Sequence, residues 1–194
     1  KKNEFNLGFD AGLWQNRIGV TFDVYSRNNF DEMGIMVTQG LGGEVERAAN
    51  VAEMRSNGME LSISSTNIKK KDFSWSTSFV YSYTNTEITK LFNSGNVISL
   101  VSGTGFPKRG YPARALFSIP FVGINDEGVP MVMNEKGQVT TDDINFQERT
   151  NTDYLKYEGP TDPKYTGSLG NVFSYKNFHL NVFLTYSFGN VVRL

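Results

Sequence analysis

Neighbouring carboxylates are the first candidates for chemistry in this 194-residue sequence. Asp142–Asp143 and Asn125–Asp126–Glu127 carry side chains that serve elsewhere as calcium ligands or as general acids and bases. Neither group has the full spacing of an EF-hand loop. The Asn, Asp and Gly content around residues 125–128 is typical of tight turns. A turn is therefore the favoured interpretation of both groups.

Other motifs that could bind or react are incomplete. Gly40–Gly43 is glycine-rich, as phosphate-binding loops are, but it lacks their Gly-Lys-Ser/Thr ending and their strand-to-helix setting. The single histidine, His179, has no second histidine and no cysteine with which to form a metal centre or a nucleophilic pair. Lys69–Lys71 is most simply a solvated turn. The sequence predicts no catalytic residue, no metal site and no cofactor, and hence no enzyme.

Charge and composition remove further classes of protein. The 19 basic and 20 acidic residues give a net charge of −1, without the basic footprint that nucleic-acid binding requires. The absence of cysteine excludes a disulfide framework within the sequence. Its longest apolar stretch, Ala115–Ile124, is only about ten residues and too short for a transmembrane helix. No signal peptide is evident at the start, and we expect the chain to be part of a longer protein.

Six segments alternate bulky apolar and small polar residues at a period of two, the pattern of strands with two unlike faces. The clearest is 73–84, where aromatic residues alternate with mostly hydroxylic ones. Strands of roughly 10 to 14 residues are expected, against about five or six in typical globular proteins. A 12-residue strand tilted by about 45° covers about 28 Å, the thickness of a bilayer hydrocarbon core. The six segments lie at residues 6–13, 18–25, 59–66, 73–84, 165–175 and 178–189.

The connections between these segments alternate in length. Long connections are expected over about residues 30–56 and 90–164. The intervening turns are short and are flanked by aromatic residues, as at an interfacial aromatic girdle. Outer-membrane barrels have this asymmetry, with short periplasmic turns and long extracellular loops. We therefore predict an all-β fold, a segment of an antiparallel transmembrane β-barrel. The expected short turns are 15–17, 68–72 and 176–177, flanked by Trp14, Phe73, Trp75, Tyr175 and Phe178.

The alternation also assigns the two faces of the expected wall. Residues of the bulky set should contact lipid, and residues of the small polar set should face a polar lumen. A soluble β-sandwich would also alternate, but its solvated faces usually carry Lys and Glu, in which these polar faces are poor. The lipid set includes Phe79, Tyr81, Leu180, Val182 and Leu184, and the lumen set includes Ser74, Ser76, Ser78, Asn181 and Thr185.

The two long connections should hold small structures of their own. A short hairpin is expected over 123–139, and Thr140–Asp143 could cap a helical turn. In the first connection, Gln39–Gly43 is expected to be flexible and Glu44–Met54 could form a short helix. Long loops on a rigid scaffold commonly carry recognition, so aromatic residues in the second connection could stack on sugar rings, the alternative being a packed loop core. These candidate substrate-binding residues are Phe106, Tyr111, Phe117 and Tyr154.

Several segments also resemble a known family in family order. Phe5–Leu13 and Asn16–Tyr25 resemble a barrel hairpin of TonB-dependent outer-membrane transporters of the SusC/RagA type. The most specific similarity is Asp162–Gly167 followed by Tyr186–Asn190. Further similar segments are Asn57–Leu61, Lys71–Trp75, Gly110–Pro112, Phe121–Asn125, Asp126–Pro130, Asn171, Phe173 and Tyr175–Phe178.

The resemblance implies a 22-stranded barrel with an N-terminal plug, which imports nutrients with energy transmitted through TonB. It implies the outer membrane of Bacteroides-type Gram-negative bacteria, a SusD-like surface lipoprotein as partner, and oligosaccharides or peptides as cargo. Residues 1–194 would be a C-terminal part of the barrel. They are expected to include no plug and no TonB-binding box, and six strands cannot close a barrel alone. The alternatives are a soluble β-rich glycan-binding or adhesin module, and a passive porin or outer-membrane enzyme barrel sharing only the architecture.

Overall fold

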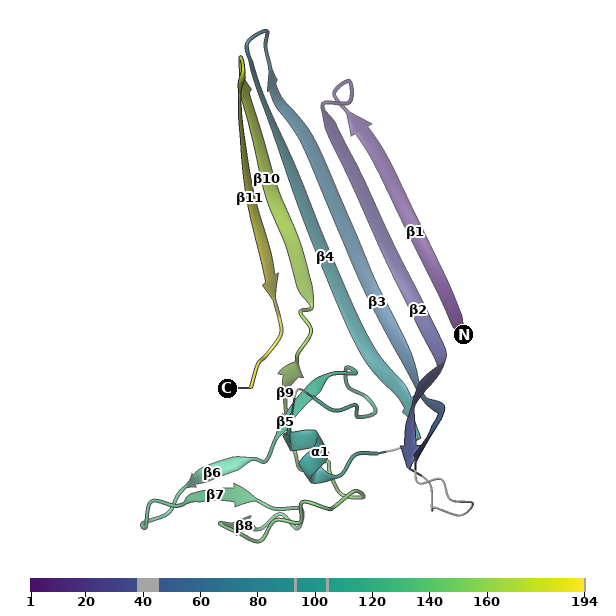
Figure 1. Cartoon of the computed structure of the whole chain (residues 1–194), viewed down its shortest axis with the longest axis vertical. Helices are drawn as coiled ribbons and strands as arrows, with labels where there is room; N and C mark the ends of the chain where they lie inside the picture. Colours follow the sequence, from purple (N-terminus) through teal and green to yellow (C-terminus); the bar gives the residue numbers. More distant parts are fainter. Residues whose placement is uncertain (38–45, 93, 104, 194) are drawn as a thin grey trace.

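The computed structural model describes residues 1–37, 46–92, 94–103 and 105–193. Its main element is an antiparallel six-stranded sheet, which we term the wall, in the order β1-β2-β3-β4-β10-β11 (Figure 1). All six expected strands are present. They are β1 (Lys2–Leu13), β2 (Ile18–Val37), β3 (Glu46–Lys69), β4 (Phe73–Leu91), β10 (Tyr165–Tyr175) and β11 (Phe178–Phe188).

Four wall strands, β1 to β4, are longer than the alternation predicts, and β2 and β3 are extended most. The connection expected over residues 30–56 is wrong over most of its length, because β2 continues to Val37 and β3 begins at Glu46. The helix expected over Glu44–Met54 is wrong for the same reason wherever the segment is described. Polar residues interrupt the alternation here, yet backbone pairing continues through register shifts near Glu32. The expected flexible segment Gln39–Gly43 lies outside the described residues.

The three short turns lie together at one end of the wall, as expected, and we term it the turn end (Figure 1). Between β1 and β2, Trp14, Gln15 and Asn16 all have positive φ angles, of 49°, 57° and 63°. This left-handed backbone reverses the chain within a few residues. The β10–β11 turn uses Lys176 in the same way, at φ 50°.

The connection from β4 to β10 folds into a small unit at the opposite end, the loop end. We term this unit, within residues 94–161, the loop module. Two strands form one pair, β5–β9, and three form a second sheet, β6-β7-β8. The expected hairpin over 123–139 is confirmed and gains β8 as a third strand. The module comprises α1 (Val97–Val101), β5 (Ala115–Ser118), β6 (Phe121–Ile124), β7 (Pro130–Met133), β8 (Val139–Thr140) and β9 (Lys156–Pro160).

The helical turn of the module is displaced from the expected position. No helix forms at Thr140–Asp143, because the Thr140 hydroxyl accepts hydrogen bonds from the amides of residues 142 and 143 in a tight turn. The helix is α1, whose N-terminus is capped by Asn96 Oδ1 accepting from the Ser99 amide at 3.1 Å. Among the described residues, no helix has the length and apolar character needed to span a membrane.

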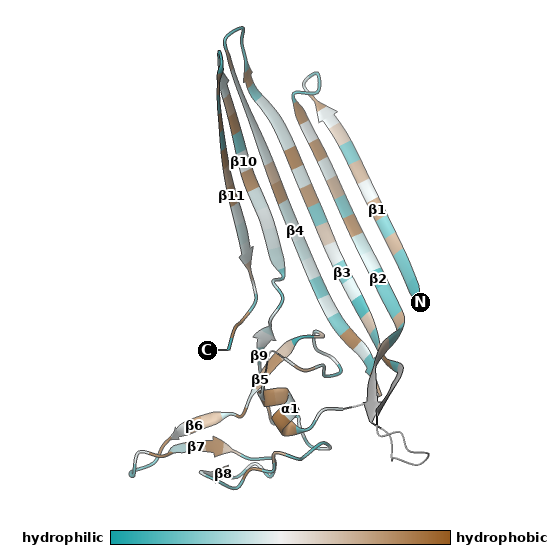
Figure 2. Ribbon diagram, viewed as in Figure 1, coloured by the Kyte–Doolittle hydropathy of each residue, from teal (hydrophilic) through white to brown (hydrophobic). Residues whose placement is uncertain are grey.

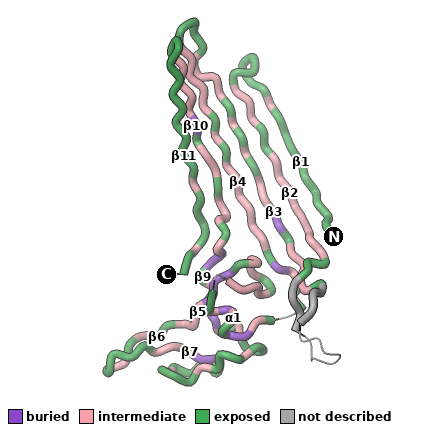
Figure 3. The backbone as a smooth tube through the Cα atoms, viewed as in Figure 1, coloured by how far each residue is buried: buried purple, intermediate pink, exposed green. Residues whose placement is uncertain are grey.

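The buried apolar cluster of the molecule lies in the loop module and not in the wall (Figure 3). Phe117 and Val97 are completely buried there, whereas Leu7 and Leu184 of the wall are each 61% exposed. The wall is a single layer, and within the described ranges no second layer covers either face. The cluster consists of Val97, Leu100, Ala115, Phe117 and Leu155.

Backbone and side-chain hydrogen bonds fix the loop module to the wall. The Gly110 amide donates to the Ile88 carbonyl of β4, and the Ile88 amide donates to the Tyr111 carbonyl, both at 2.9 Å. After β11, the Arg193 guanidinium donates to the carbonyls of Gly103 and Phe117 at 3.1 and 2.9 Å. The module is therefore anchored both by β4 and by the segment that follows β11.

Candidate functional site

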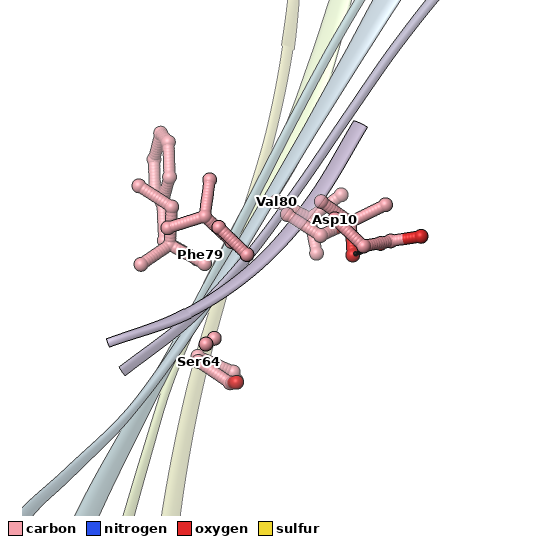
Figure 4. Close-up of a pocket in the computed structure, with 12 residues that line it drawn as sticks. Asp10, Ser64, Phe79 and Val80 are labelled. Atoms are coloured by element: carbon pink, nitrogen blue, oxygen red, sulfur yellow. Dashed lines mark hydrogen bonds between the residues drawn. The ribbon is translucent and has the colours of Figure 1, made fainter. Parts of the chain in front are cut away.

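The two faces of the wall are chemically different, as the register shows. One cross-strand row joins only apolar residues, and the next row joins mostly polar ones. Bands of opposite hydropathy alternate along the strands in Figure 2. Figure 4 shows Phe79 on one side of the sheet and Asp10 and Val80 on the other. The first row is Ala11, Val20, Ile63, Phe79, Leu169 and Leu184; the second is Asp10, Thr21, Ser62, Val80, Ser168 and Thr185.

We term these the apolar face and the polar face. The residues assigned to opposite faces from the sequence do lie on opposite faces, because neighbouring residues in a strand point to opposite sides. The apolar face has large side chains more than half exposed, including Phe9 and Leu180.

Small residues on neighbouring strands leave part of the polar face without large side chains. Gly12, Gly19, Ser64 and Ser78 line a shallow hollow of about 330 Å³ towards the turn end of the wall. Beside it, the Thr21 hydroxyl donates to Asp10 at 2.6 Å. Such a face leaves room for other protein or for water close to the backbone.

Nearer the loop end, an aromatic side chain covers a glycine of the polar face. Tyr25 lies across Gly58, where an added Cβ would overlap its ring, and its hydroxyl shares a hydrogen bond of 2.9 Å with Thr84. Gly58 is thus required for this close approach. The bridge ties β2 to β4 across β3 and stiffens the wall.

A polar network interrupts the apolar face near the turn end, and the sequence pattern did not single it out. Asn171 Oδ1 accepts from Trp75 Nε1 at 2.9 Å and from the Thr77 hydroxyl at 2.8 Å. Asn67 Nδ2 also contacts the Thr77 hydroxyl, at 2.6 Å. Trp75 stacks on Phe173 with ring centroids 5.6 Å apart. The network supplies the Trp75 indole N–H with a partner within the protein.

The structure brings the four candidate substrate residues together in the loop module. Phe117 is completely buried, so its ring has no free surface for a ligand. Tyr111 meets it edge to face at 5.0 Å, and Phe106 and Tyr154 pack against the same cluster. Stacking on cargo stays a prediction for Phe106, Tyr111 and Tyr154, which remain partly exposed.

Two tyrosine hydroxyls in this module are buried without a hydrogen-bond partner among the described residues, those of Tyr154 and Tyr157. Burial raises the pKa of both phenols, and the carboxylates of Glu135 and Glu148 raise that of Tyr154 further. Both therefore stay protonated at neutral pH. Both tyrosine rings pack against the cluster around Phe117.

The other chemistry-bearing motifs have structural explanations. Asn125 Oδ1 accepts from the amides of Glu127 and Val129, which confirms the turn at this motif. His179 shares a hydrogen bond of 2.9 Å with Ser174. Over the described ranges, no group of three or more His, Asp or Glu side chains is arranged to hold a metal ion.

Three cations that the sequence did not single out line a hollow of about 280 Å³ in the loop module: Lys108, Arg109 and Arg149. Arg149 is about 40 residues away from the other two along the chain, so no local pattern in the sequence could have grouped them. Their arrangement depends on the fold of the module.

Known proteins are similar in sequence to this chain over nearly its whole length. It is 25% identical over 203 residues to "TonB-dependent receptor P3" of Formosa agariphila, covering 97% of this chain and 20% of the relative. It is 28% identical over 207 residues to "TonB-dependent receptor SusC" of Bacteroides thetaiotaomicron, covering 99% and 20%. The chain thus spans about a fifth of the length of the curated relatives it matches. No family model matches it.

Solved structures also match nearly the whole chain. The RagAB peptide transporter superposes with a TM-score of 0.76 at 25% identity, over 97% of this chain and 21% of that chain. The RagAB peptide importer in its "closed-closed" state gives the same TM-score at 26% identity, with the same coverage. The resemblance to SusC/RagA-type TonB-dependent transporters is therefore confirmed, and with it the all-β fold of a barrel segment.

Proposed function

We propose that this chain is a section of the barrel of a SusC/RagA-type, TonB-dependent outer-membrane transporter, and that the complete protein actively imports nutrients. The observation that carries the proposal is the wall itself. One face of it is apolar and is covered by no other layer of the described residues, while the other is polar. The similarity to TonB-dependent receptors over nearly the whole chain supports the same assignment.

Hydrocarbon is the environment that suits the apolar face. In water, exposed groups such as Phe9 and Leu184 would cost roughly 25 cal/mol for each Å² of apolar surface that lipid would cover. Backbone groups in a barrel are paired between strands, so the wall can meet lipid without unsatisfied hydrogen bonds. Trp75, with its hydrogen-bonded indole near the turn end, suits the depth of an interfacial aromatic girdle.

The polar face suits the inside of such a barrel. Its small residues around Gly12 and Ser64 leave space for a plug domain or for water along the transport path. The loop module would then stand at the extracellular mouth, since it lies at the end opposite the short turns (Figure 1). Long loops on a rigid wall are suited to recognising cargo.

The proposal includes parts that lie beyond this chain. Residues 1–194 would form one section of the barrel, and the plug and the contact with TonB would belong to the rest of the complete protein. A SusD-like surface lipoprotein would be the partner at the loop end, in the outer membrane of a Bacteroides-type bacterium. Oligosaccharides are the proposed cargo, with peptides as the alternative because the similar RagAB structures are of a peptide transporter.

Expression of the complete gene in a Bacteroides-type host tests the proposal. We expect the protein in the outer-membrane fraction, with the heat-modifiable mobility of a barrel, and uptake of its cargo that stops when TonB is deleted. Labelled oligosaccharide and peptide mixtures, offered separately, would identify the cargo class. Recovery as a soluble protein, or uptake that persists without TonB, would contradict the proposal.

A further inference from the structure

The loop module contains a hollow with a concentration of positive charge. Its volume is about 280 Å³, and Leu91 at the end of β4 forms part of its wall. Three cations and one carboxylate line it in a chain whose net charge is −1. The polar lining includes Lys108, Arg109, Arg149, Asp153, Thr150 and Thr152.

Lys108 is fixed in the wall of the hollow. Its side chain is only 14% exposed, and its ammonium lies 2.9 Å from Asp153 Oδ1 and 3.0 Å from the Thr152 carbonyl. The same ammonium lies above the rings of Tyr111 and Phe117, at 5.6 and 5.4 Å from their centroids. The loop core thus holds this charge in one position, and Asp153 offsets it.

The two arginines are different, because both are exposed. Within the part of the chain that the structure describes, no carboxylate forms an ion pair with Arg109 or Arg149. Glu148 adjoins the hollow but is not part of its lining. Its carboxylate accepts hydrogen bonds from the Thr150 hydroxyl and from neighbouring loop amides. Two guanidinium groups therefore remain available to a ligand.

We propose that this hollow binds an anionic group, a carboxylate or a sulfate, carried by the cargo. The inference rests on the proposed function and adds a preference for acidic over neutral oligomers. Guanidinium groups pair with such oxyanions through parallel hydrogen bonds, and Thr150 adds a hydroxyl donor. The volume is just below the usual range for ligand pockets, about 300–1,000 Å³, so it suits one sugar ring or one amino-acid unit.

Titration of the complete purified transporter with matched probes tests the inference. The probes are hexagalacturonate against neutral galactohexaose, and pentaglutamate against pentaglutamine. We expect the double variant Arg109→Gln/Arg149→Gln to bind an acidic probe at least about tenfold more weakly, because each lost charge-assisted hydrogen bond weakens affinity. Its affinity for the neutral probes should stay unchanged.

The matched control is Arg114→Gln/Lys136→Gln, which removes the same charge from the same module outside the hollow. Both of these side chains are more than half exposed and form surface ion pairs. The control should bind the acidic probes as the natural sequence does. The probe pair that shows the charge preference identifies the source of the anion as a sugar acid or a peptide acid.

Several results would overturn the inference: no binding of either acidic probe, equal affinity in the arginine variant and the natural sequence, or an equal loss in the control. Failure of the proposed function is distinguished by outer-membrane assembly and TonB-dependent uptake, measured separately. A working importer without any charge preference would overturn the anionic hollow alone. A protein that does not assemble in the outer membrane would overturn the proposed function itself.

Discussion

The wall and the loop module differ in how far they bury large apolar side chains. In the module, Phe117 is completely buried among other protein groups, as in a water-soluble domain. In the wall, Phe9 and Leu184 are more than 60% exposed and point away from a single sheet. The difference shows that the module has a protein core of its own, whereas the large apolar side chains of the wall have no such cover among the described residues. Under the proposed function, the module would stand in water and the apolar face of the wall would contact lipid.

The contrast also explains why the two regions differ in what holds them together. Wall strands pair mainly with their neighbours in sequence. The backbone hydrogen bonds between them are compatible with many different side chains at each position. The module instead depends on contacts between distant segments, such as β5 with β9 across about 40 residues. Substitutions should therefore affect one region and spare the other, and the following predictions test that separation in the complete protein.

The largest effect is expected in the loop core. Phe117→Ala should destabilise the module by about 3–5 kcal/mol, because it removes a fully buried ring and leaves a cavity. Limited proteolysis of the assembled protein should show faster cleavage within residues 94–161, while the heat-modifiable barrel band stays unchanged.

Phe121→Ala is the matched control, since this side chain is 64% exposed in the same module. It should change the cleavage rate little, as surface substitutions generally stay within about 0.5 kcal/mol. An equal increase in cleavage rate for the two variants, or loss of the heat-modifiable barrel band in Phe117→Ala, would show that the module and the wall do not unfold independently.

The next effect compares the two faces of the wall. Leu184→Arg places a charge on the apolar face and should cost about 2–4 kcal/mol near the bilayer midplane, whereas Thr185→Arg on the polar face should be tolerated. The measurement is the fraction of each variant that folds into the outer membrane, relative to the natural sequence. Similar losses at both positions would contradict the assignment of the faces.

A smaller effect is expected where wall and module meet. Arg193→Ala removes two hydrogen bonds from a charged donor to the Gly103 and Phe117 carbonyls, and should loosen the module by about 1–3 kcal/mol. Proteolysis near residue 103 should accelerate with no change in outer-membrane assembly. An unchanged cleavage rate would mean that the tail does not anchor the module.

The smallest effect concerns pH. Hydrogen bonds from the Thr150 hydroxyl and from loop amides lower the pKa of Glu148 from 4.5 to about 2. A lowered pKa in the folded state means that this stabilisation is full above about pH 4.5 and is lost as pH falls towards 2. Proteolysis by an acid-active protease should show the 149–151 turn opening over that window. In Glu148→Gln the turn should lose this pH dependence, and an unaltered profile would contradict the assignment.

The sequence was most informative about the wall. Alternation over 73–84 and 178–189 predicted both the strands and their faces, because the period of two directly reports a sheet with unlike sides. The ends of β2 and β3 were missed because residues such as Asn28 and Asn29 are polar at successive positions. These ends extend by backbone pairing, which side-chain hydropathy does not report.

The loop module was only partly predictable. The turn at Asn125 has a local signature and was predicted, but α1, β9 and the pairing of β5 with β9 depend on contacts between segments distant in sequence. The basic hollow was missed for the same reason, since Arg109 and Arg149 are single charges until the module folds. The polar network at Asn171 likewise appears only once β4 and β10 are in register.

Accessibility along β11 tests the central claim most directly. Single cysteines, introduced one at a time at residues 178–188 of the complete protein in a bilayer and spin-labelled, would be exposed to oxygen and to a water-soluble nickel chelate. If the wall spans a membrane, spin labels at even-numbered positions such as 180, 182 and 184 will collide mainly with oxygen. Labels at odd-numbered positions such as 181 and 185 will collide mainly with the chelate. Equal collision of both reagents along the strand, or chelate access at even positions, would contradict it.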